Sequence, residues 1–258
     1  MHVILCITQI KSFKMAYDIG RYTGMIDLST YCNAACPQCH RTNQGNIQEK
    51  QPWLPLIQLD LNLFKKRFDV RQLKMYKELV FCGTWGDPFM AKDVHEIIEY
   101  VLKNSSAYIT LNTNGAMRNE EFWFDFGLLT YKYGPRINVV FAIDGYTEEQ
   151  HAKYRRNTSL KKVLSHMDAY MQCPKSRSTV FTVVFEHNED DISKITEIAD
   201  KYGAYAHHIQ PSNRFFYGHE DNIRGKHPET FKFYNEGSLE TLKKSKKITR
   251  YYEVILNE

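Results

Sequence analysis

The chain has 258 residues, 43% of them hydrophobic and 25% charged, with a formal net charge of +4. These values are typical of a globular protein with one large domain or two small ones. The charge is too small for this length to indicate nucleic-acid binding. No apolar stretch approaches the ~20 residues that span a bilayer. We therefore expect neither a nucleic-acid partner nor a membrane.

The first ten residues are apolar but lack a basic leader and a small-residue cleavage site, so we expect no signal peptide. We therefore expect a cytoplasmic protein, in which thiols stay reduced. Cys6, Cys82 and Cys173 are scattered along the chain, which is typical of small buried hydrophobic residues. The other three cysteines lie within eight residues of one another and need a separate explanation.

Strand-like and helix-like patterns alternate from about residue 25 onward. The strand-like runs are β-branched or aromatic and are bounded by Gly, Pro or Asn, as in a buried parallel sheet. Six strands are expected, at 25–30, 78–82, 107–113, 137–143, 179–185 and 204–209.

Apolar residues at helical spacing predict the intervening helices. Asp93 and Glu96 are expected to form a start like a capping box for one of them. Asn188 is a candidate N-cap for the last helix, and Gly203 fits the left-handed position after its end. The helices are expected at 60–68, 94–102, 119–129, 160–167 and 192–202.

Six strands alternating with five helices imply right-handed βαβ units and a parallel sheet, so the expected fold class is α/β. Periodicity alone does not decide between an open sheet and a barrel. In either, ligands bind beyond the carboxyl ends of the strands. Two long segments rich in turn-forming residues, 41–58 and 211–236, are candidate substrate loops.

Cys32, Cys36 and Cys39 directly follow the first predicted strand with C-x3-C-x2-C spacing. Cys36 and Cys39 alone would fit a thioredoxin-type redox pair, which leaves Cys32 without a role. Cys36 to His40 matches the attachment pattern of haem c, which normally accompanies export. Structural zinc would need a fourth ligand, and the sequence has no second cysteine pair. An iron–sulfur cluster with three thiolates is the fourth interpretation, and it leaves one iron open to a ligand.

The cysteine spacing resembles the signature of the radical S-adenosylmethionine (SAM) superfamily. The resemblance implies that Cys32, Cys36 and Cys39 hold a [4Fe–4S] cluster whose open iron chelates the amino and carboxylate groups of SAM. It also implies a partial (β/α)6 barrel with parallel strands. The corresponding domains are an N-terminal extension over 1–24, a core over 25–210, and a C-terminal extension over 211–258 that covers or closes the barrel.

Two segments after the second and third predicted strands are similar to family motifs. Trp85-Gly86-Asp87-Pro88 resembles the family's G-G-E-P element, with Asp in place of Glu. Thr113-Asn114-Gly115 is similar to its T-N-G segment. The resemblance implies that Gly86, Asp87 and Asn114 contact or orient SAM. Taken alone, the first segment would also fit an ordinary strand-to-helix turn.

The fourth and fifth strands end in similar matches. Asp144 lies in an Ile-Asp-Gly triplet followed by His151 and by Arg155-Arg156, like the pattern of the branch that often carries a C-terminal SPASM domain. The resemblance implies that Asp144 orients SAM and that an arginine, Arg155 or Arg156, pairs with its carboxylate. Asn188 follows a histidine as in the same branch, so it is either a SAM contact or the helix cap named above.

The sequence departs from the family pattern at two positions and over one segment. Gln38 stands where the residue before the third cysteine is usually aromatic, and Ala142 stands where a serine is expected. No cysteine follows residue 210, so we expect no auxiliary-cluster domain in 211–258. The aromatic residues of that segment could close the open side of the barrel or pack in the core.

The resemblance implies an oxidoreductase-type enzyme in which the cluster, reduced by a donor such as flavodoxin or ferredoxin, cleaves SAM. The resulting 5′-deoxyadenosyl radical takes hydrogen from a substrate. The similarity to the peptide-modifying branch favours a peptide or protein side chain. The alternatives are a small molecule or nucleotide precursor, activation of a glycyl-radical partner, and a metal-stabilised binding protein. The sequence does not identify a catalytic hydrogen donor, although Cys82 and Cys173 are available thiols.

Overall fold

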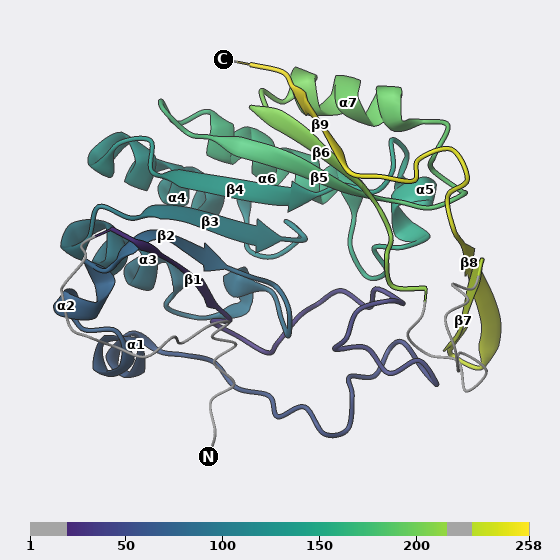
Figure 1. Cartoon of the computed structure of the whole chain (residues 1–258), viewed down its shortest axis with the longest axis horizontal. Helices are drawn as coiled ribbons and strands as arrows, with labels where there is room; N and C mark the ends of the chain where they lie inside the picture. Colours follow the sequence, from purple (N-terminus) through teal and green to yellow (C-terminus); the bar gives the residue numbers. More distant parts are fainter. Residues whose placement is uncertain (1–19, 216–228, 258) are drawn as a thin grey trace.

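The computed structural model describes residues 20–215 and 229–257 (Figure 1). Most of the predicted N-terminal extension, including Cys6, and part of the predicted loop 211–236 lie outside these residues. The strands are β1 (Tyr22–Ile26), β2 (Tyr76–Phe81), β3 (Tyr108–Thr113), β4 (Ile137–Ala142), β5 (Ser178–Val184), β6 (Ala206–Pro211), β7 (Thr230–Asn235), β8 (Ser238–Lys243) and β9 (Tyr252–Ile255). The helices are α1 (Leu61–Arg67), α2 (Val70–Leu73), the 3₁₀ turn η1 (Pro88–Met90), α3 (Val94–Asn104), α4 (Glu120–Tyr133), α5 (Glu148–Ala152), α6 (Leu160–Met171) and α7 (Ile192–Lys201).

Seven strands form the central sheet in the order β1-β2-β3-β4-β5-β6-β9. The first six are parallel, and each is joined to the next by at least one helix. β9 pairs antiparallel with β6, so β1 and β9 are the edge strands. The predicted α/β class with a partial (β/α)6 barrel of parallel strands is confirmed.

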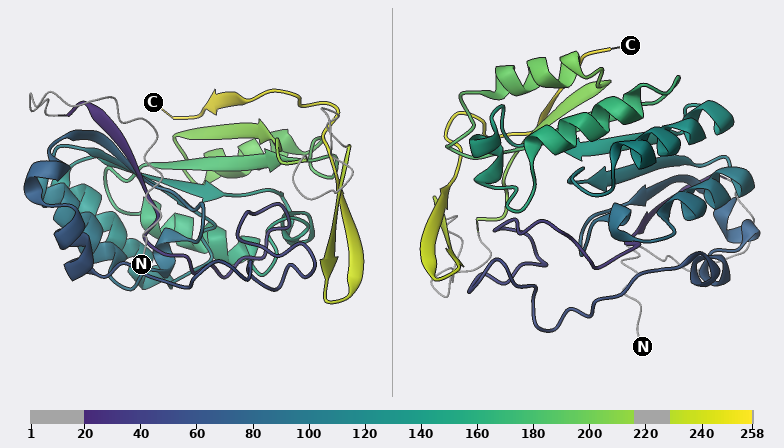
Figure 2. Two further views of the ribbon diagram at one scale, coloured as in Figure 1. Left: turned by 60° about the horizontal axis from the view of Figure 1, so that its bottom comes forward. Right: turned by 180° about the vertical axis from the view of Figure 1, so that it is seen from behind.

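The helices α3, α4 and α6 lie behind the sheet in Figure 1 and in front of it in the reverse view of Figure 2. The sequence pattern explains this for α3, whose side chains Val94, Ile97, Ile98 and Val101 are fully buried. Burial of each contributes about 1.5–3 kcal/mol relative to an exposed side chain. The apolar stripe therefore fixes which face of the helix meets the sheet.

The contact between α4 and α6 requires a glycine. A Cβ atom on Gly127 would lie 2.7 Å from the Sγ of Cys173 and 2.8 Å from the backbone oxygen of Tyr170. Trp123 and Tyr170 are fully buried in the same core. Cys173 is buried as the sequence predicts, and its place in this helix contact makes it a packing residue and not a hydrogen donor at the strand ends.

Of the two predicted helix caps, one holds the N-cap position without the side-chain bond and the other is wrong. Asp93 precedes α3 but makes no side-chain cap; its carboxylate accepts a hydrogen bond of 2.9 Å from the backbone nitrogen of Leu61 and so ties α1 to α3. The N-cap position of α7 is held by Asp191 and not by Asn188. Gly203 has a φ of +72° directly after α7, as expected.

Several boundaries also differ from the prediction. β1 spans Tyr22–Ile26, so residues 27–30 of the expected first strand belong to the loop that follows. α4 continues four residues past the predicted end at 129. The hairpin β7–β8 was not predicted, although its two-residue loop, Glu236 and Gly237, has positive φ at both positions, as in a type I′ turn.

The hairpin packs against the long loop after the cysteines. The backbone nitrogen of Ile47 donates to the oxygen of Tyr234 at 2.9 Å, and the nitrogen of Tyr234 donates to the oxygen of Gln44 at 3.0 Å. Figures 1 and 2 place the hairpin at the end of the molecule beyond the carboxyl ends of the parallel strands. Within the described residues, no helix combines the length and apolar character needed to cross a membrane.

Candidate functional site

The three clustered cysteines lie in the loop that leaves the carboxyl end of β1. The backbone nitrogen of Cys39 donates to the oxygen of Cys36 at 3.0 Å, which folds the loop into a turn. Cys36 is buried, whereas Cys32 and Cys39 are half-buried. They pack beside an apolar cluster that includes Tyr154 and Phe185. The loop thus brings the three thiols into partly shielded surroundings at the end of the sheet.

Two distant side chains reach the sulfur atoms. The Nη1 of Arg155 lies 3.8 Å from the Sγ of Cys36, and the Nδ2 of Asn114 lies 3.6 Å from the Sγ of Cys32. Burial raises the pKa of Cys36 to about 11, while the Arg155 guanidinium opposes that shift. Burial also raises the pKa of Cys32. A bound metal centre would therefore be needed to hold both groups as thiolates.

Three thiols in one loop are a donor set suited to an iron–sulfur cluster with one open iron. In the part of the chain that the structure describes, no three His, Cys, Asp or Glu side chains converge as they would around one metal ion. In a [4Fe–4S] cube each thiolate binds a different iron, so its cysteines lie around the cube. Hydrogen bonds to the sulfurs are a normal part of such sites, and Arg155 and Asn114 are placed to supply them.

The turn after β2 packs tightly against the start of the cysteine loop. A Cβ atom on Gly86 would lie 2.3 Å from the backbone oxygen of Ser29 and 2.6 Å from that of Tyr31. The backbone nitrogen of Asp87 donates to the oxygen of Tyr31 at 2.8 Å. Gly86 is therefore required for the close approach of two backbone segments, a role in addition to the predicted contact with SAM.

Asp27 is a site residue that the sequence analysis missed. Its Oδ1 accepts from the backbone nitrogens of Thr84 at 3.0 Å and Trp85 at 3.3 Å. Its Oδ2 accepts from the Sγ of Cys82 at 3.6 Å. An aspartate directly after the apolar run of the first strand was the signal available in the sequence. It fixes the loop between β2 and Gly86.

The carboxylate of Asp87 is buried and fully engaged by the protein. Its Oδ1 accepts from the backbone nitrogen of Phe89 at 3.0 Å, and its Oδ2 accepts from that of Asn114 at 2.8 Å. The hydroxyl of Thr113 also donates to Oδ2 at 2.9 Å. Burial raises the pKa of Asp87 despite these bonds. Asp87 thus joins the end of β2 to the end of β3.

Asn114 connects that junction to the cysteine loop. Its Nδ2 donates to the Oδ1 of Asn33 at 2.9 Å, in addition to facing Cys32. Its Oδ1 accepts from the backbone nitrogen of Ala116 at 2.9 Å. Both ends of the amide are therefore oriented, with the NH₂ group toward the cysteines.

Asp144 and Arg155 form a buried ion pair at the end of β4. The Nε of Arg155 lies 2.5 Å from the Oδ2 of Asp144, whose Oδ1 accepts from the backbone nitrogen of Val183 at 2.6 Å. The Nδ1 of the buried His151 accepts from the backbone nitrogen of Asp144 at 3.3 Å. Arg156 points elsewhere and pairs with Glu240 on β8. Of the two arginine side chains, that of Arg155 reaches a cysteine of the loop.

Asn188 braces this ion pair from the end of β5. Its Nδ2 donates to the backbone oxygens of Asp144 and Val183, both at 3.0 Å, and its Oδ1 accepts from the nitrogen of Phe185 at 2.8 Å. Asn188 is completely buried. These three bonds explain why it does not serve as a helix cap.

Gln38, the residue that departs from the family pattern, anchors the cysteine loop to the segment after β6. Its Oε1 accepts from the hydroxyl of Ser212 at 2.5 Å, and its backbone oxygen accepts from the Nη1 of Arg214 at 3.2 Å. Its buried Nε2 has no hydrogen-bond partner among the described residues. A polar side chain thus replaces the expected aromatic one at this position.

The described part of the chain defines an α/β protein with a three-cysteine loop at the carboxyl ends of its parallel strands, which is the arrangement of a radical SAM protein. The family model described as the radical SAM superfamily matches residues 26–199. The chain belongs to this superfamily of enzymes. The family implies a [4Fe–4S] cluster and SAM as cofactors.

One curated relative is a probable GTP 3′,8-cyclase of Methanocaldococcus jannaschii, 23% identical over 184 residues, which are 69% of this chain and 55% of that protein. The chain is also similar to the anSMEcpe structure with bound AdoMet and the Cp18Cys peptide, with a TM-score of 0.55 and 16% identity over 78% of this chain and 54% of that one. Streptococcus suis SuiB bound to its precursor peptide SuiA matches with a TM-score of 0.55 and 12% identity over 73% of this chain and 39% of that one. The chain spans about half the length of these relatives.

Proposed function

We propose that this chain reductively cleaves SAM at a [4Fe–4S] cluster held by Cys32, Cys36 and Cys39. The observation that carries the proposal is that side chains from the ends of β3 and β4 direct N–H groups at the sulfurs of this loop. When bound, the cluster and SAM supply the electron transfer and the 5′-deoxyadenosyl radical that takes hydrogen from a substrate. The chain supplies binding, orientation and exclusion of water.

Arg155, Asn114 and the turn at Gly86 are the groups that we assign to holding the cluster and SAM. Arg155 carries a charge suited to a carboxylate, and Asp144 and Asn188 fix its position. Because both carboxylate oxygens of Asp87 are occupied by the protein, Asp87 acts as a positioning residue and not as a direct ligand.

A peptide or protein side chain is the substrate class that we favour. The support is structural similarity to anSMEcpe and SuiB, both of which have structures with a bound peptide. A nucleotide or other small anion is the second candidate, supported by the sequence similarity to a probable GTP 3′,8-cyclase. An electron donor such as flavodoxin or ferredoxin would complete the system.

The segment 211–258 is proposed to cover one side of the site. Its described part contributes the hairpin beside the loop 44–48 and the edge strand β9. Phe231 and Phe233 of β7 pack in the same apolar cluster as Cys36. An apolar cover of this kind would shield a radical from water.

The test is anaerobic reconstitution with iron and sulfide, followed by addition of SAM and dithionite. We expect 5′-deoxyadenosine by mass spectrometry from the wild-type chain and none from the Cys32→Ala/Cys36→Ala/Cys39→Ala variant. Cys173→Ala, which removes a buried thiol between two helices, is the matched control and retains the product. Equal product from the triple variant would refute the assignment.

A further inference from the structure

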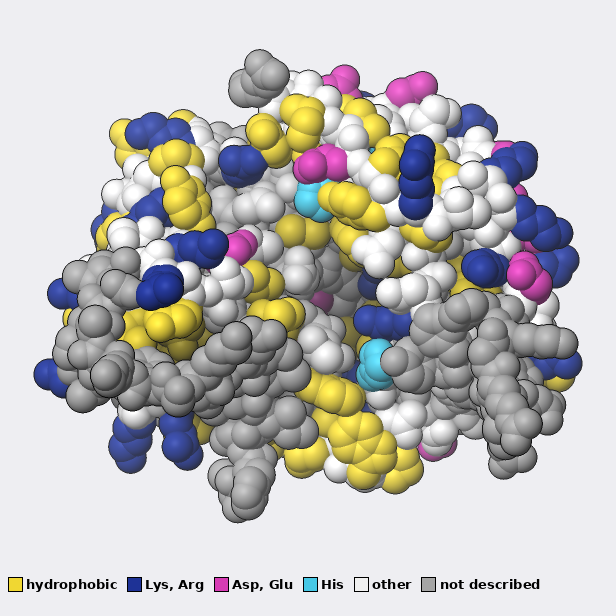
Figure 3. Space-filling view, in the orientation of Figure 1, with side chains coloured by type: hydrophobic (Ala, Val, Ile, Leu, Met, Phe, Trp, Pro, Cys, Tyr) yellow, Lys and Arg dark blue, Asp and Glu magenta, His cyan; other side chains and the backbone are white. Residues whose placement is uncertain are grey.

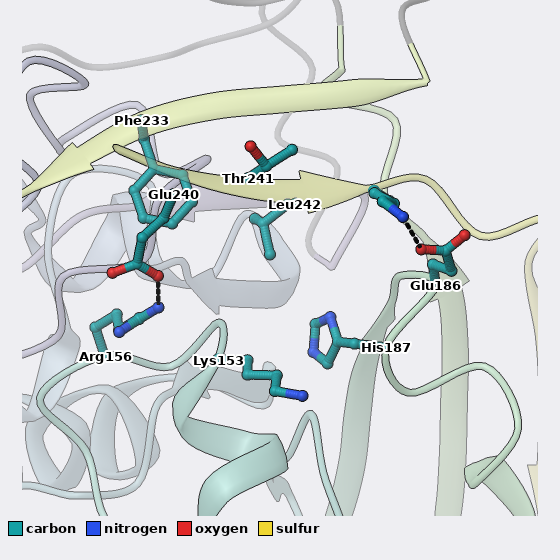
Figure 4. A pocket seen from close by; sticks show the side chains of 9 residues that line it. Lys153, Arg156, Glu186, His187, Phe233, Glu240, Thr241 and Leu242 are labelled. Carbon is teal, nitrogen blue, oxygen red and sulfur yellow. Dashed lines mark hydrogen bonds and ion pairs between the residues drawn. The ribbon is translucent and has the colours of Figure 1, made fainter. Parts of the chain in front are cut away.

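A polar cavity lies between the hairpin, the end of β5 and the turn that follows α5. Its volume is about 280 Å³. Figure 4 shows Lys153, Arg156 and His187 beneath the hairpin strand that carries Glu240 and Leu242. Arg156 was a candidate partner of the SAM carboxylate, but its side chain pairs with Glu240, and Lys153 and His187 lie outside the proposed SAM contacts.

Two residues that line this cavity each carry a buried nitrogen atom with no hydrogen-bond partner among the described residues. These atoms are the Nε of Arg156 and the Nε2 of His187, and both are shielded from solvent. An unsatisfied buried donor costs about 1–3 kcal/mol, so such groups normally have a partner. Lys153 is exposed and forms no ion pair within the described part of the chain. The lining residues therefore include two buried nitrogens without a partner and one exposed lysine outside any ion pair among the described residues.

The carboxylates of the cavity are already compensated. Glu240 pairs with Arg156 through Nη2 and also accepts from Asn235 at 3.0 Å. Glu186 is paired with Lys243 at 3.2 Å and with Lys246 at 3.5 Å. The charge of Lys153 is left over, which favours an anion in the cavity.

The pKa of His187 also reflects the positive charge around the cavity. Its ring stacks on that of Phe185 with centroids 5.5 Å apart. Burial, then the nearby charges of Lys153 and Arg156, lower its pKa to about 4. The ring is thus neutral near pH 7 and offers one N–H as a donor.

The cavity is joined directly to the cysteine loop. The backbone oxygen of Arg156 accepts from the nitrogen of Ala35 at 3.0 Å, between Cys32 and Cys36. Phe233 and Leu242 line the cavity and also belong to the apolar cluster that contains Cys36. Figure 3 shows that the molecular face in this view is hollowed near its centre, with basic side chains at the margin of the hollow. A group held in the cavity would therefore lie beside the proposed reaction site.

We propose that this cavity binds an oxyanionic group of the substrate, a carboxylate or a phosphoryl group, through Arg156, His187 and Lys153. That the anion belongs to a substrate rests on the proposed function, whereas anion binding itself is inferred from the cavity and its nitrogen groups. Because Arg156 Nε and His187 Nε2 are shielded, binding includes a shift of the surrounding side chains, with the exposed Lys153 free to move.

The test is isothermal titration calorimetry of the reconstituted full-length protein in the presence of SAM. Inorganic pyrophosphate and glutarate are titrated separately as probes. We expect saturable binding of at least one probe, and the tighter one identifies the phosphoryl or carboxylate class. His187→Phe keeps the ring stacking but removes the N–H, and Lys153→Met removes the charge. Each should weaken binding by about tenfold or more, as expected for hydrogen bonds to a charged group.

The matched control is Lys161→Met, which removes an exposed lysine on α6 outside the cavity and should leave binding unchanged. Absence of binding for both probes, or equal binding in all variants, would overturn the proposed site. 5′-Deoxyadenosine formation is measured on the same wild-type preparation. Normal product without probe binding refutes only the cavity assignment, whereas probe binding without product refutes only the radical chemistry.

Discussion

Arg155 bridges Asp144 and Cys36 through different nitrogens of one guanidinium. Nε lies 2.5 Å from the Oδ2 of Asp144, and Nη1 lies 3.8 Å from the Sγ of Cys36. Burial alone would lower the pKa of Arg155, but Asp144 and Cys36 outweigh it and raise that pKa. The positive charge beside the cysteine loop is therefore permanent, and its position is set from the end of β4.

Replacing Arg155 with methionine should destabilise the protein by about 3–5 kcal/mol, because it leaves the buried Asp144 carboxylate without its partner. Denaturant unfolding of the cluster-free protein measures this. The double variant Arg155→Met/Asp144→Asn should recover part of the loss, since it removes the unpaired charge. A loss below about 1 kcal/mol for the single variant would mean that the pair is not formed in solution.

Gly86→Ala should displace the start of the cysteine loop. The added Cβ would meet the backbone oxygens of Ser29 and Tyr31 at 2.3 and 2.6 Å, and backbone cannot move aside as a flexible side chain can. We expect about 1–3 kcal/mol of destabilisation and a lower iron content after reconstitution. Gly45→Ala, whose Cβ would meet only a side-chain atom at 3.4 Å, is the control. Wild-type iron content in Gly86→Ala would contradict the close contact.

Periodicity and turn residues predicted the sheet because its strands are short apolar runs and α3 carries one clear stripe. The same local patterns could not assign Asp93 or Asn188. Both are good cap residues, but each makes its hydrogen bonds to a different element, Asp93 to α1 and Asn188 to β4 and β5. Tertiary partners decided these roles, and a single sequence does not contain them.

The sequence predicted the site residues that belong to a family motif. It did not predict roles that depend on contacts between segments far apart in the chain. The choice of Arg155 over Arg156 follows from their partners, because Arg155 pairs with Asp144 whereas Arg156 pairs with Glu240. Asp27 belongs to no motif that the sequence analysis used, yet it holds the turn before Gly86. Such contacts depend on how β1 is aligned with β2. Because the sequence placed the first strand at 25–30 instead of Tyr22–Ile26, it did not show that Asp27 follows the strand and faces the turn after β2.

Asn188 tests the distinction between a helix cap and a bridge between strands. Asn188→Ala should cost about 2–4 kcal/mol, because three buried backbone groups lose their partner. Asn188→Ser keeps a residue type that caps helices, but its single, shorter hydroxyl cannot replace both N–H donors to the oxygens of Asp144 and Val183, so we expect no full rescue. Denaturant unfolding compares the variants, and full recovery by serine would support the capping role instead.

Acid should destabilise the protein through His151. Burial, then the nearby Arg155 charge, lowers its pKa to about 3, against about 6.5 in an unfolded chain. Above pH ~6.5 His151 is neutral in both the folded and the unfolded state. Between pH ~6.5 and pH ~3 only the unfolded state binds the proton. The free energy of unfolding therefore decreases by up to ~1.4 kcal/mol for each pH unit of acidification in this range. In His151→Gln the slope of unfolding free energy against pH should be shallower by about one proton. An unchanged slope would show that His151 titrates normally.

The most direct test is EPR of the reduced cluster with and without SAM. The central claim is that three cysteines hold a [4Fe–4S] cluster with one iron open to this ligand. We expect about four irons per chain and a spectrum that changes when SAM is added, and neither in the variant with alanine at Cys32, Cys36 and Cys39. A cluster spectrum that does not respond to SAM, or a chain that assembles no cluster under anaerobic conditions, would contradict it.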